Sequence, residues 1–149
     1  MKALATIAVT FFCFNTIAQQ PELILPLGHA EEIYNAEFSL NKKFLLTLSP
    51  ESGVNIWEVA TGRLMNSILP ENGQIIVAHF SPDGSYLATG GTDSLLRLWE
   101  TKNSRLIWTA KNRSRIRDLH FSPDGKKIGL VCHFAPLVVW EHDSVLVGA

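Results

Sequence analysis

The sequence has little cysteine, no low-complexity stretch and no excess of one charge over its 149 residues. A formal net charge of −1 argues against a general binder of nucleic acid or anionic membranes, which would need a broad basic surface. The motifs C-x-x-C, H-E-x-x-H and G-x-S-x-G are missing, as are phosphate loops and dinucleotide fingerprints. We therefore expect no enzymatic activity, no bound metal and no cofactor.

The first eighteen residues differ in character from the rest. Lys2 supplies a positive start, an apolar run follows from Ala3 to Phe14, and Thr16 and Ala18 are the small residues before a cut at Gln19. This pattern is typical of a secretory signal peptide. The apolar run is shorter than the roughly 20 residues of a membrane span. The pattern predicts export through a signal peptide at 1–18, a periplasmic or extracellular location and no stable membrane span after cleavage.

Cysteine usage is compatible with export. Cys13 would leave with the signal peptide, so Cys132 would stand alone and could form no internal disulfide. Cys132 lies in an apolar run, which favours a buried thiol over a bond between two chains.

Three segments of the chain align without a gap over 21 residues, beginning at Phe38, Phe80 and Phe121. The spacing from this Phe to a Trp is 19 residues in each copy, and the period is 42 and then 41 residues. Each unit contains four short apolar runs, so the period predicts blades of four antiparallel strands that bury their faces only by stacking. We expect an all-β chain from residue 22 to 149, with repeats at about 29–69, 70–110 and 111–149.

The second unit shows the predicted strands most clearly, because turn residues separate its apolar runs. The runs predict strands at 75–80, 86–90, 95–100 and 106–110. Between the first two, Pro82 fixes φ, Asp83 caps the turn and Gly84 takes a positive φ.

At this point the chain resembles the WD-repeat β-propeller family, in the form found in secreted bacterial proteins. The resemblance rests on Gly28-His29, on FSPDG at 80–84 and 121–125, and on Trp-Glu at 57–58, 99–100 and 140–141, where Glu replaces the usual Asp. It implies a fold of β-propeller blades and a protein-interaction scaffold without a cofactor. In a longer polypeptide, such blades would be a recognition part beside an enzyme such as a peptidase. A third hypothesis is that the chain is a truncated product without activity of its own.

The family often locks each blade with a hydrogen-bonded set of His, Ser or Thr, Asp and Trp. No copy here is complete, since Glu51, Glu71 and Asn112 replace family residues. We therefore expect apolar packing between blades to hold the array together. The residues matching the set, and read as structural, are His29, Thr47, Trp57, Thr89, Asp93, Trp99 and Trp140.

Three blades are too few for a closed ring, since propellers use about four to eight. Residues 22–27 resemble the outer strand that seals the last blade of a ring, while 145–147 begin an outer strand for the third blade. Two explanations follow: the chain is the leading piece of a longer protein, or two copies form a homo-oligomer that completes the ring.

The resemblance also implies where a protein or peptide partner would bind, namely on the top face of the propeller. The positions that the family uses there predict Tyr34, Thr92, Arg117 and His133 as partner-binding residues. A basic loop from Lys111 to Arg117 lies at the same face, and it is either a receptor for an acidic group or simply a solvated loop.

Two histidines occupy the same place in successive repeats. His79 and His120 each precede the repeat Phe by one residue, which places them on one face of a strand. Because zinc needs three or four converging ligands, we interpret both as sheet-face histidines and not as metal ligands.

Overall fold

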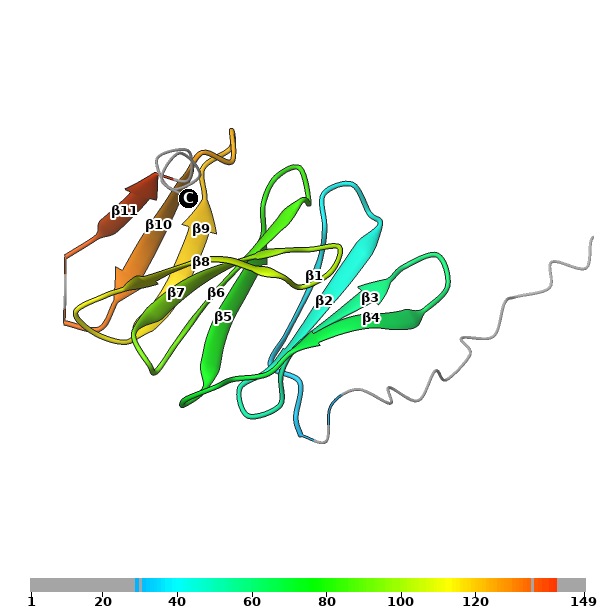
Figure 1. The fold of residues 1–149 in the computed structure, drawn as a ribbon, viewed down its shortest axis with the longest axis horizontal. Coiled ribbons are helices and arrows are strands. Elements are labelled where there is room, and N and C mark those ends of the chain that lie inside the picture. The colour runs from blue at the N-terminus through cyan, green and yellow to red at the C-terminus, as the bar shows by residue number, and fades with distance from the viewer. Residues whose placement is uncertain (1–28, 30, 135, 142–149) are drawn as a thin grey trace, which may run out of the picture.

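The computed structural model describes residues 29, 31–134 and 136–141, and its regular elements in this part of the chain are all strands. Figure 1 shows three sheets side by side, each splayed from its neighbour as in a fan. The strands are β1 (Asn35–Phe38), β2 (Phe44–Ser49), β3 (Gly53–Glu58), β4 (Arg63–Ile68), β5 (Ile75–Phe80), β6 (Tyr86–Gly91), β7 (Leu95–Glu100), β8 (Leu106–Lys111), β9 (Ile116–Phe121), β10 (Lys127–Cys132) and β11 (Val138–Glu141).

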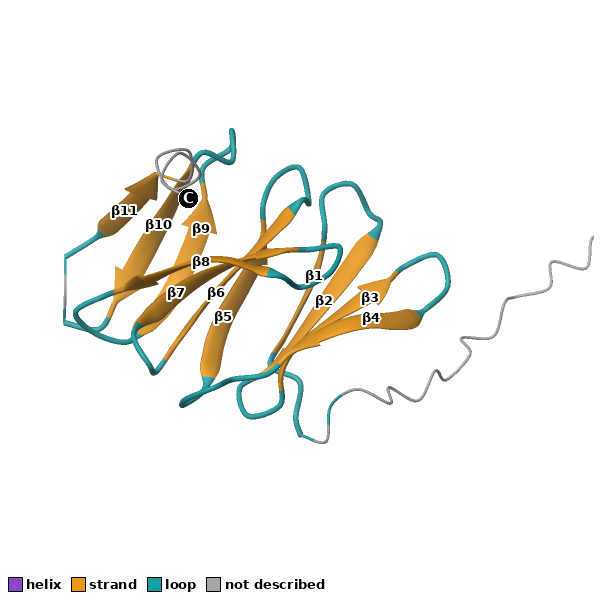
Figure 2. Ribbon diagram, in the orientation of Figure 1, coloured by secondary structure: helices purple, strands orange, loops and turns teal. Residues whose placement is uncertain are grey.

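Each sheet is one blade whose strands follow one another in the chain. The order is β1-β2-β3-β4 in the first blade, β5-β6-β7-β8 in the second and β9-β10-β11 in the third, with antiparallel pairing throughout. Short loops join consecutive strands (Figure 2). The fold class is confirmed as all-β with propeller-type blades, four-stranded in the first two blades and with three strands in the described part of the third. The four strands predicted in the second unit end within one residue of those observed.

Several expectations fall on residues outside the part of the chain that the structure describes. They are the signal peptide at 1–18, the sealing strand at 22–27 and the outer strand at 145–147. Within the described residues, the structure contains no helix that is long and apolar enough to cross a membrane.

The first turn of each blade follows the sequence prediction. Gly84 and Gly125 have φ of 74° and 73°, and the aspartate before each glycine accepts a hydrogen bond from a serine hydroxyl at 2.6 Å. In the first blade Lys42 takes the glycine position with φ of 58°, and Asn41 accepts from Ser39 at 2.8 Å. The turn geometry is therefore preserved without the usual residues, at the cost of a left-handed lysine.

Two apolar cores hold the blades together, one at each contact between neighbours. Between the first and second blades the buried side chains include Leu46, Ile56 and Leu87, and between the second and third they include Leu98 and Leu119. Alternate residues of a strand point to opposite faces of the sheet, so the middle blade contributes to both cores. Apolar packing between blades is thus extensive, as the sequence analysis expects.

The outer face of the first blade differs from the matching face of the second. Phe38 is 61% exposed and its counterpart Phe80 is 6% exposed, while Ile33 is 41% exposed and its counterpart Ile75 is 6% exposed. These outer-face residues line an apolar groove together with Leu45 and Trp57. The array therefore presents an open apolar flank at its first blade.

Candidate partner-binding edge

The loops that precede the first strand of each blade lie beside the loops that join its second and third strands. We call this side of the array the loop edge. Backbone hydrogen bonds connect these two sides of each blade: Tyr34 N–H donates to the Leu48 carbonyl in β2, Thr92 N–H to the Gln74 carbonyl, and His133 N–H to the Arg115 carbonyl, at 2.9, 3.0 and 3.0 Å. All four predicted partner-binding residues come from this edge, at or next to the ends of strands.

Tyr34 is strongly exposed, with 71% of its surface accessible. It borders a depression of about 340 Å³ whose other walls include Pro50 and the carboxylates Glu31, Glu32 and Glu51. An exposed tyrosine beside a hollow is a common anchor in protein interfaces. The first blade therefore offers an aromatic and acidic surface at the loop edge.

Arg117 and His133 gather at the third blade, where the loop edge is basic. The His133 ring approaches the Arg115 guanidinium, with Nε2 and Nη2 3.0 Å apart, and it packs edge-on against Phe134. Partial desolvation and the positive charges of Arg115 and Arg117 hold the pKa of His133 below its usual 6.5. A neutral imidazole beside two exposed guanidinium groups suits an anionic group on a partner.

Thr92 lies at the second blade and is less available than Tyr34. Its hydroxyl accepts a hydrogen bond from the Gln74 backbone N–H at 2.8 Å, and its own N–H donates to the Gln74 carbonyl. These bonds commit Thr92 to holding two loops together, so we give it a positioning role between the Tyr34 and Arg117 surfaces.

The residues read as structural form hydrogen-bonded sets within the first two blades. In the first blade the Thr47 hydroxyl lies 2.9 Å from His29 Nε2 and accepts from Trp57 Nε1 at 2.8 Å. In the second blade Trp99 Nε1 donates to Thr89 at 2.9 Å. Burial lowers the pKa of His29, although its hydrogen bond to the Thr47 carbonyl opposes the shift. The tryptophan–threonine bond is therefore common to both blades.

The second blade adds a buried ion pair. Arg97 is 8% exposed, its Nη1 lies 2.6 Å from the Asp93 carboxylate and its Nη2 lies 3.7 Å from Glu71. Thus Asp93 contacts one terminal nitrogen of an arginine. Glu71 occupies the histidine position of the family and approaches the other terminal nitrogen of the same guanidinium. In the third blade Trp140 Nε1 donates to Asn112 over 3.4 Å, a long bond.

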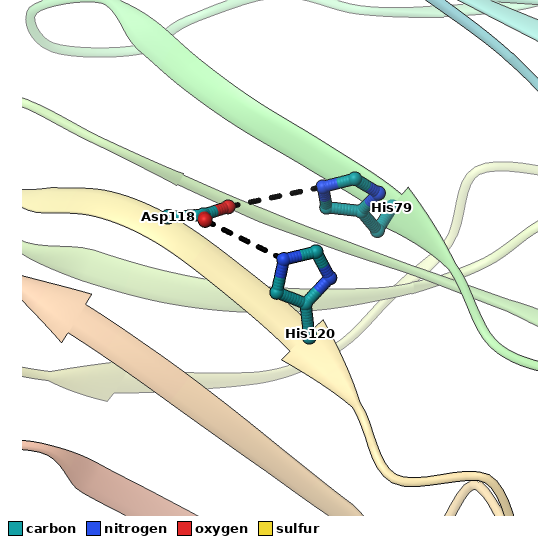
Figure 3. A group of neighbouring side chains, drawn as sticks. All are labelled: His79, Asp118 and His120. Atoms are coloured by element: carbon teal, nitrogen blue, oxygen red, sulfur yellow. Dashed lines mark ion pairs between the residues drawn. The ribbon is translucent and has the colours of Figure 1, made fainter.

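Away from the loop edge, the structure brings Asp118 together with the two histidines that share a repeat position. His79 on β5 faces Asp118 and His120 on β9, and the two imidazole rings lie 4.8 Å apart. Figure 3 shows the three side chains pointing toward one another between parallel strands. The shared repeat position of the two histidines was the available signal, because β5 and β9, the first strands of adjacent blades, lie next to each other and bring equivalent residues together.

Cys132 is buried and is the free cysteine of the described residues. Burial raises the pKa of its thiol. The sequence had favoured this interpretation, in which Cys132 acts as a small buried hydrophobic residue.

Comparison with known proteins bears directly on these blades. Residues 67–100 match the family model described as WD domain, G-beta repeat. The match begins in the outermost strand of the first blade and ends with β7, so it spans one repeat as the WD pattern counts it. The WD repeat predicted from the sequence is therefore supported by both the family match and the blade structure.

The chain is also similar to longer proteins from eukaryotes. It is 25% identical over 125 residues to "Eukaryotic translation initiation factor 3 subunit I" of Scheffersomyces stipitis, covering 79% of this chain and 36% of that protein. It is 28% identical over 130 residues to "Small ribosomal subunit protein RACK1" of Drosophila melanogaster, covering 85% and 40%. It is 30% identical over 112 residues to "MST50-interacting protein 11" of Pyricularia oryzae, covering 74% and 35%. The chain thus spans at most two fifths of the length of these relatives.

Proposed function

We propose that this chain is an exported, non-enzymatic WD-repeat scaffold that binds a protein or peptide partner through its loop edge. The observation that carries the proposal is Tyr34, 71% exposed over a depression of about 340 Å³. The strands behind this surface are hydrogen-bonded and packed on an apolar core, so little ordering accompanies binding. The names of the three relatives describe a factor subunit, a ribosomal protein and an interacting protein, which also supports a binding role.

The charge distribution along the loop edge indicates what kind of partner it fits. Carboxylates surround Tyr34 at the first blade, whereas Arg113, Arg115 and Arg117 are exposed at the third. A partner with a basic segment and an acidic segment would match both ends. Charge complementarity of this kind mainly sets orientation and association rate.

The test is affinity capture from extracts of the source organism with the full chain as bait. The variant Tyr34→Ala/Arg117→Ala should lose a discrete partner that the parent retains, because it removes one anchor from each end of the loop edge. The matched control is Leu40→Ala/Arg63→Ala, which changes exposed residues on the opposite side of the array. Circular dichroism of both variants checks that they fold. Equal capture by all three baits would disprove the assignment.

Export forms a separate part of the proposal and rests on the N-terminal sequence pattern alone. The pattern at 1–18 supports cleavage between Ala18 and Gln19. N-terminal sequencing of the protein recovered outside the cytoplasm should therefore begin at Gln19. A protein that starts at Met1 and stays with the cytoplasmic fraction would disprove export and leave the loop-edge proposal untouched.

The open flank of the first blade supports a further proposal, that another blade covers it. Phe38 and Ile33 expose apolar surface where their counterparts in the second blade are buried. The covering blade comes either from a longer polypeptide or from a second copy that completes the ring. Sedimentation of residues 19–149 distinguishes the two origins. A folded species at twice the chain mass supports the second copy, whereas a chain that aggregates or stays an unfolded monomer supports the longer polypeptide.

A further inference from the structure

The first strand of each blade carries an ionisable side chain at one repeat position. Directly before the repeat phenylalanine stand Glu37 on β1, His79 on β5 and His120 on β9, and Asp118 lies two residues before His120 on the same face. Stacking of the blades aligns these positions in space. The row lies toward the ends of the strands away from the loop edge, so it is separate from the partner-binding surface.

From this arrangement we propose that His79, Asp118 and His120 form a zinc-binding site, with Glu37 holding His79 in place. The three side chains each offer one ligand atom, and these atoms lie within 4.8 Å of one another. His120 Nε2 is 3.4 Å and His79 Nε2 is 3.9 Å from the Asp118 carboxylate oxygens. In a tetrahedral zinc site with bonds near 2.0–2.1 Å, ligand atoms are about 3.3 Å apart. Small side-chain rotations therefore bring all three into range.

The hydrogen bond between His79 and Glu37 supports the site from behind. His79 Nδ1 and Glu37 Oε2 are 2.6 Å apart, and they link β5 of the second blade to β1 of the first. A carboxylate that accepts from one imidazole nitrogen leaves the other nitrogen free to coordinate, and ligating histidines commonly have such a partner. Here the other nitrogen is Nε2, the atom that faces Asp118 and His120 (Figure 3).

Asp118 is also held in position, because its Oδ1 accepts a hydrogen bond from the Leu119 backbone N–H at 2.9 Å. The distances from Asp118 to the two imidazoles exceed those of good N–H···O hydrogen bonds, which are 2.7–3.2 Å. The three groups thus converge without bonding directly to one another. A cation between them would satisfy two imidazole lone pairs and a carboxylate together.

The donor set favours zinc over the hard cations. Two imidazole nitrogens and one carboxylate suit Zn²⁺, whereas Mg²⁺ and Ca²⁺ prefer oxygen ligands only. The carboxylates of Asp118 and Glu37 together balance the charge of a divalent ion when both histidines are neutral.

The site opens onto a hollow, which leaves a coordination position available. Glu37, His79 and His120 border a cavity of about 310 Å³ together with Phe38, Phe80 and Phe121. Two of the three proposed ligands, His79 and His120, border this open cavity, as in zinc sites whose fourth ligand is water or a small anion.

The test is isothermal titration of the full, tag-free chain with Zn²⁺. The parent should bind one ion per chain, and His120→Ala should weaken that binding by more than about 100-fold because a ligand is lost. His120 is 69% exposed in its side chain, so this substitution leaves the packing of the blades intact. His133→Ala is the matched control, since it removes a histidine at the loop edge and should leave the affinity unchanged.

Two further measurements separate coordination from adventitious binding. Glu37→Gln keeps all three ligands and should weaken Zn²⁺ binding by about 10–100-fold, the usual effect of losing a carboxylate behind a ligating histidine. Co²⁺ in place of zinc should give the visible absorption of a tetrahedral site in the parent and lose it in Asp118→Asn. Equal zinc affinity in the parent and His120→Ala, or tighter binding of Mg²⁺ than of Zn²⁺, would overturn the proposal.

Discussion

The first and second blades have matching apolar residues at matching repeat positions, yet these residues lie in different environments. Phe80 packs against the first blade and is 6% exposed, whereas Phe38 at the same position is 61% exposed. The residue type is the same and only the neighbour differs. Burial in a repeat array is therefore a property of the contact between units, as expected when stability is the sum of repeats and their interfaces.

At one buried polar position the contrast is reversed: the environment is the same in both blades, but the residue type differs. At one repeat position the first blade has Asn55, which accepts from Ser67 at 2.6 Å, and the second has Arg97, paired with Asp93 at 2.6 Å. Both positions are buried, so each polar group needs a partner. The first blade satisfies its residue with a neutral hydrogen bond and the second with charges, which makes the second more sensitive to loss of a partner.

The largest expected effect tests the difference in burial. Phe80→Ala should lower the free energy of unfolding by about 3–5 kcal/mol, because it leaves a cavity in the core between the first two blades. Phe38→Ala should change it by less than about 1 kcal/mol, because that ring is mostly in solvent. Urea denaturation of both variants measures the contrast. If the two variants lose similar unfolding free energy at high protein concentration but differ on dilution, then a second copy covers Phe38.

The next effect tests the buried ion pair. Asp93→Ala should cost about 3 kcal/mol, since it leaves the Arg97 guanidinium buried with only the more distant Glu71. Glu51→Ala, the equivalent change in the first blade, removes an exposed carboxylate whose side-chain contact is Gln74 at 3.4 Å, and should cost less than about 0.5 kcal/mol. Denaturant midpoints provide the comparison, and equal values would show that the pair contributes no net stability.

The smallest effect concerns pH and the first turn of each blade. Burial alone would raise the pKa of Asp83, but hydrogen bonds from Ser81 and Ser85 outweigh it and hold the pKa below 3.8. The stabilisation is therefore present above pH 3.8 and is lost as the pH falls through the lower folded value. Asp83→Asn, which copies Asn41 of the first blade, should be less stable than the parent at pH 7 and match it in strong acid. If urea denaturation still shows a difference in stability between Asp83→Asn and the parent at low pH, this linkage is contradicted.

Much of the fold was predictable because the repeat made each turn signal appear more than once. The strands of the second unit and the Pro-Asp-Gly turn depend on residues close together in the chain, and both were confirmed. The partner-binding residues and the domain boundaries stay predictions, although Tyr34 and Arg117 do lie exposed at one edge. The sequence placed Asp93 in the family's histidine-based set but did not predict its contact with Arg97. Strand propensity does not specify which side chain occupies the buried position next to it.

The sequence by itself determined the period, the strands and the turns, because hydrophobic alternation and φ preferences act within a few residues. Only the tertiary structure decided which of the matching apolar faces is covered. It also brought Glu37, His79, Asp118 and His120 together from the first strands of the three blades. Those contacts join residues about 40 positions apart on neighbouring blades. Their formation depends on how one sheet packs against the next, which no local pattern specifies.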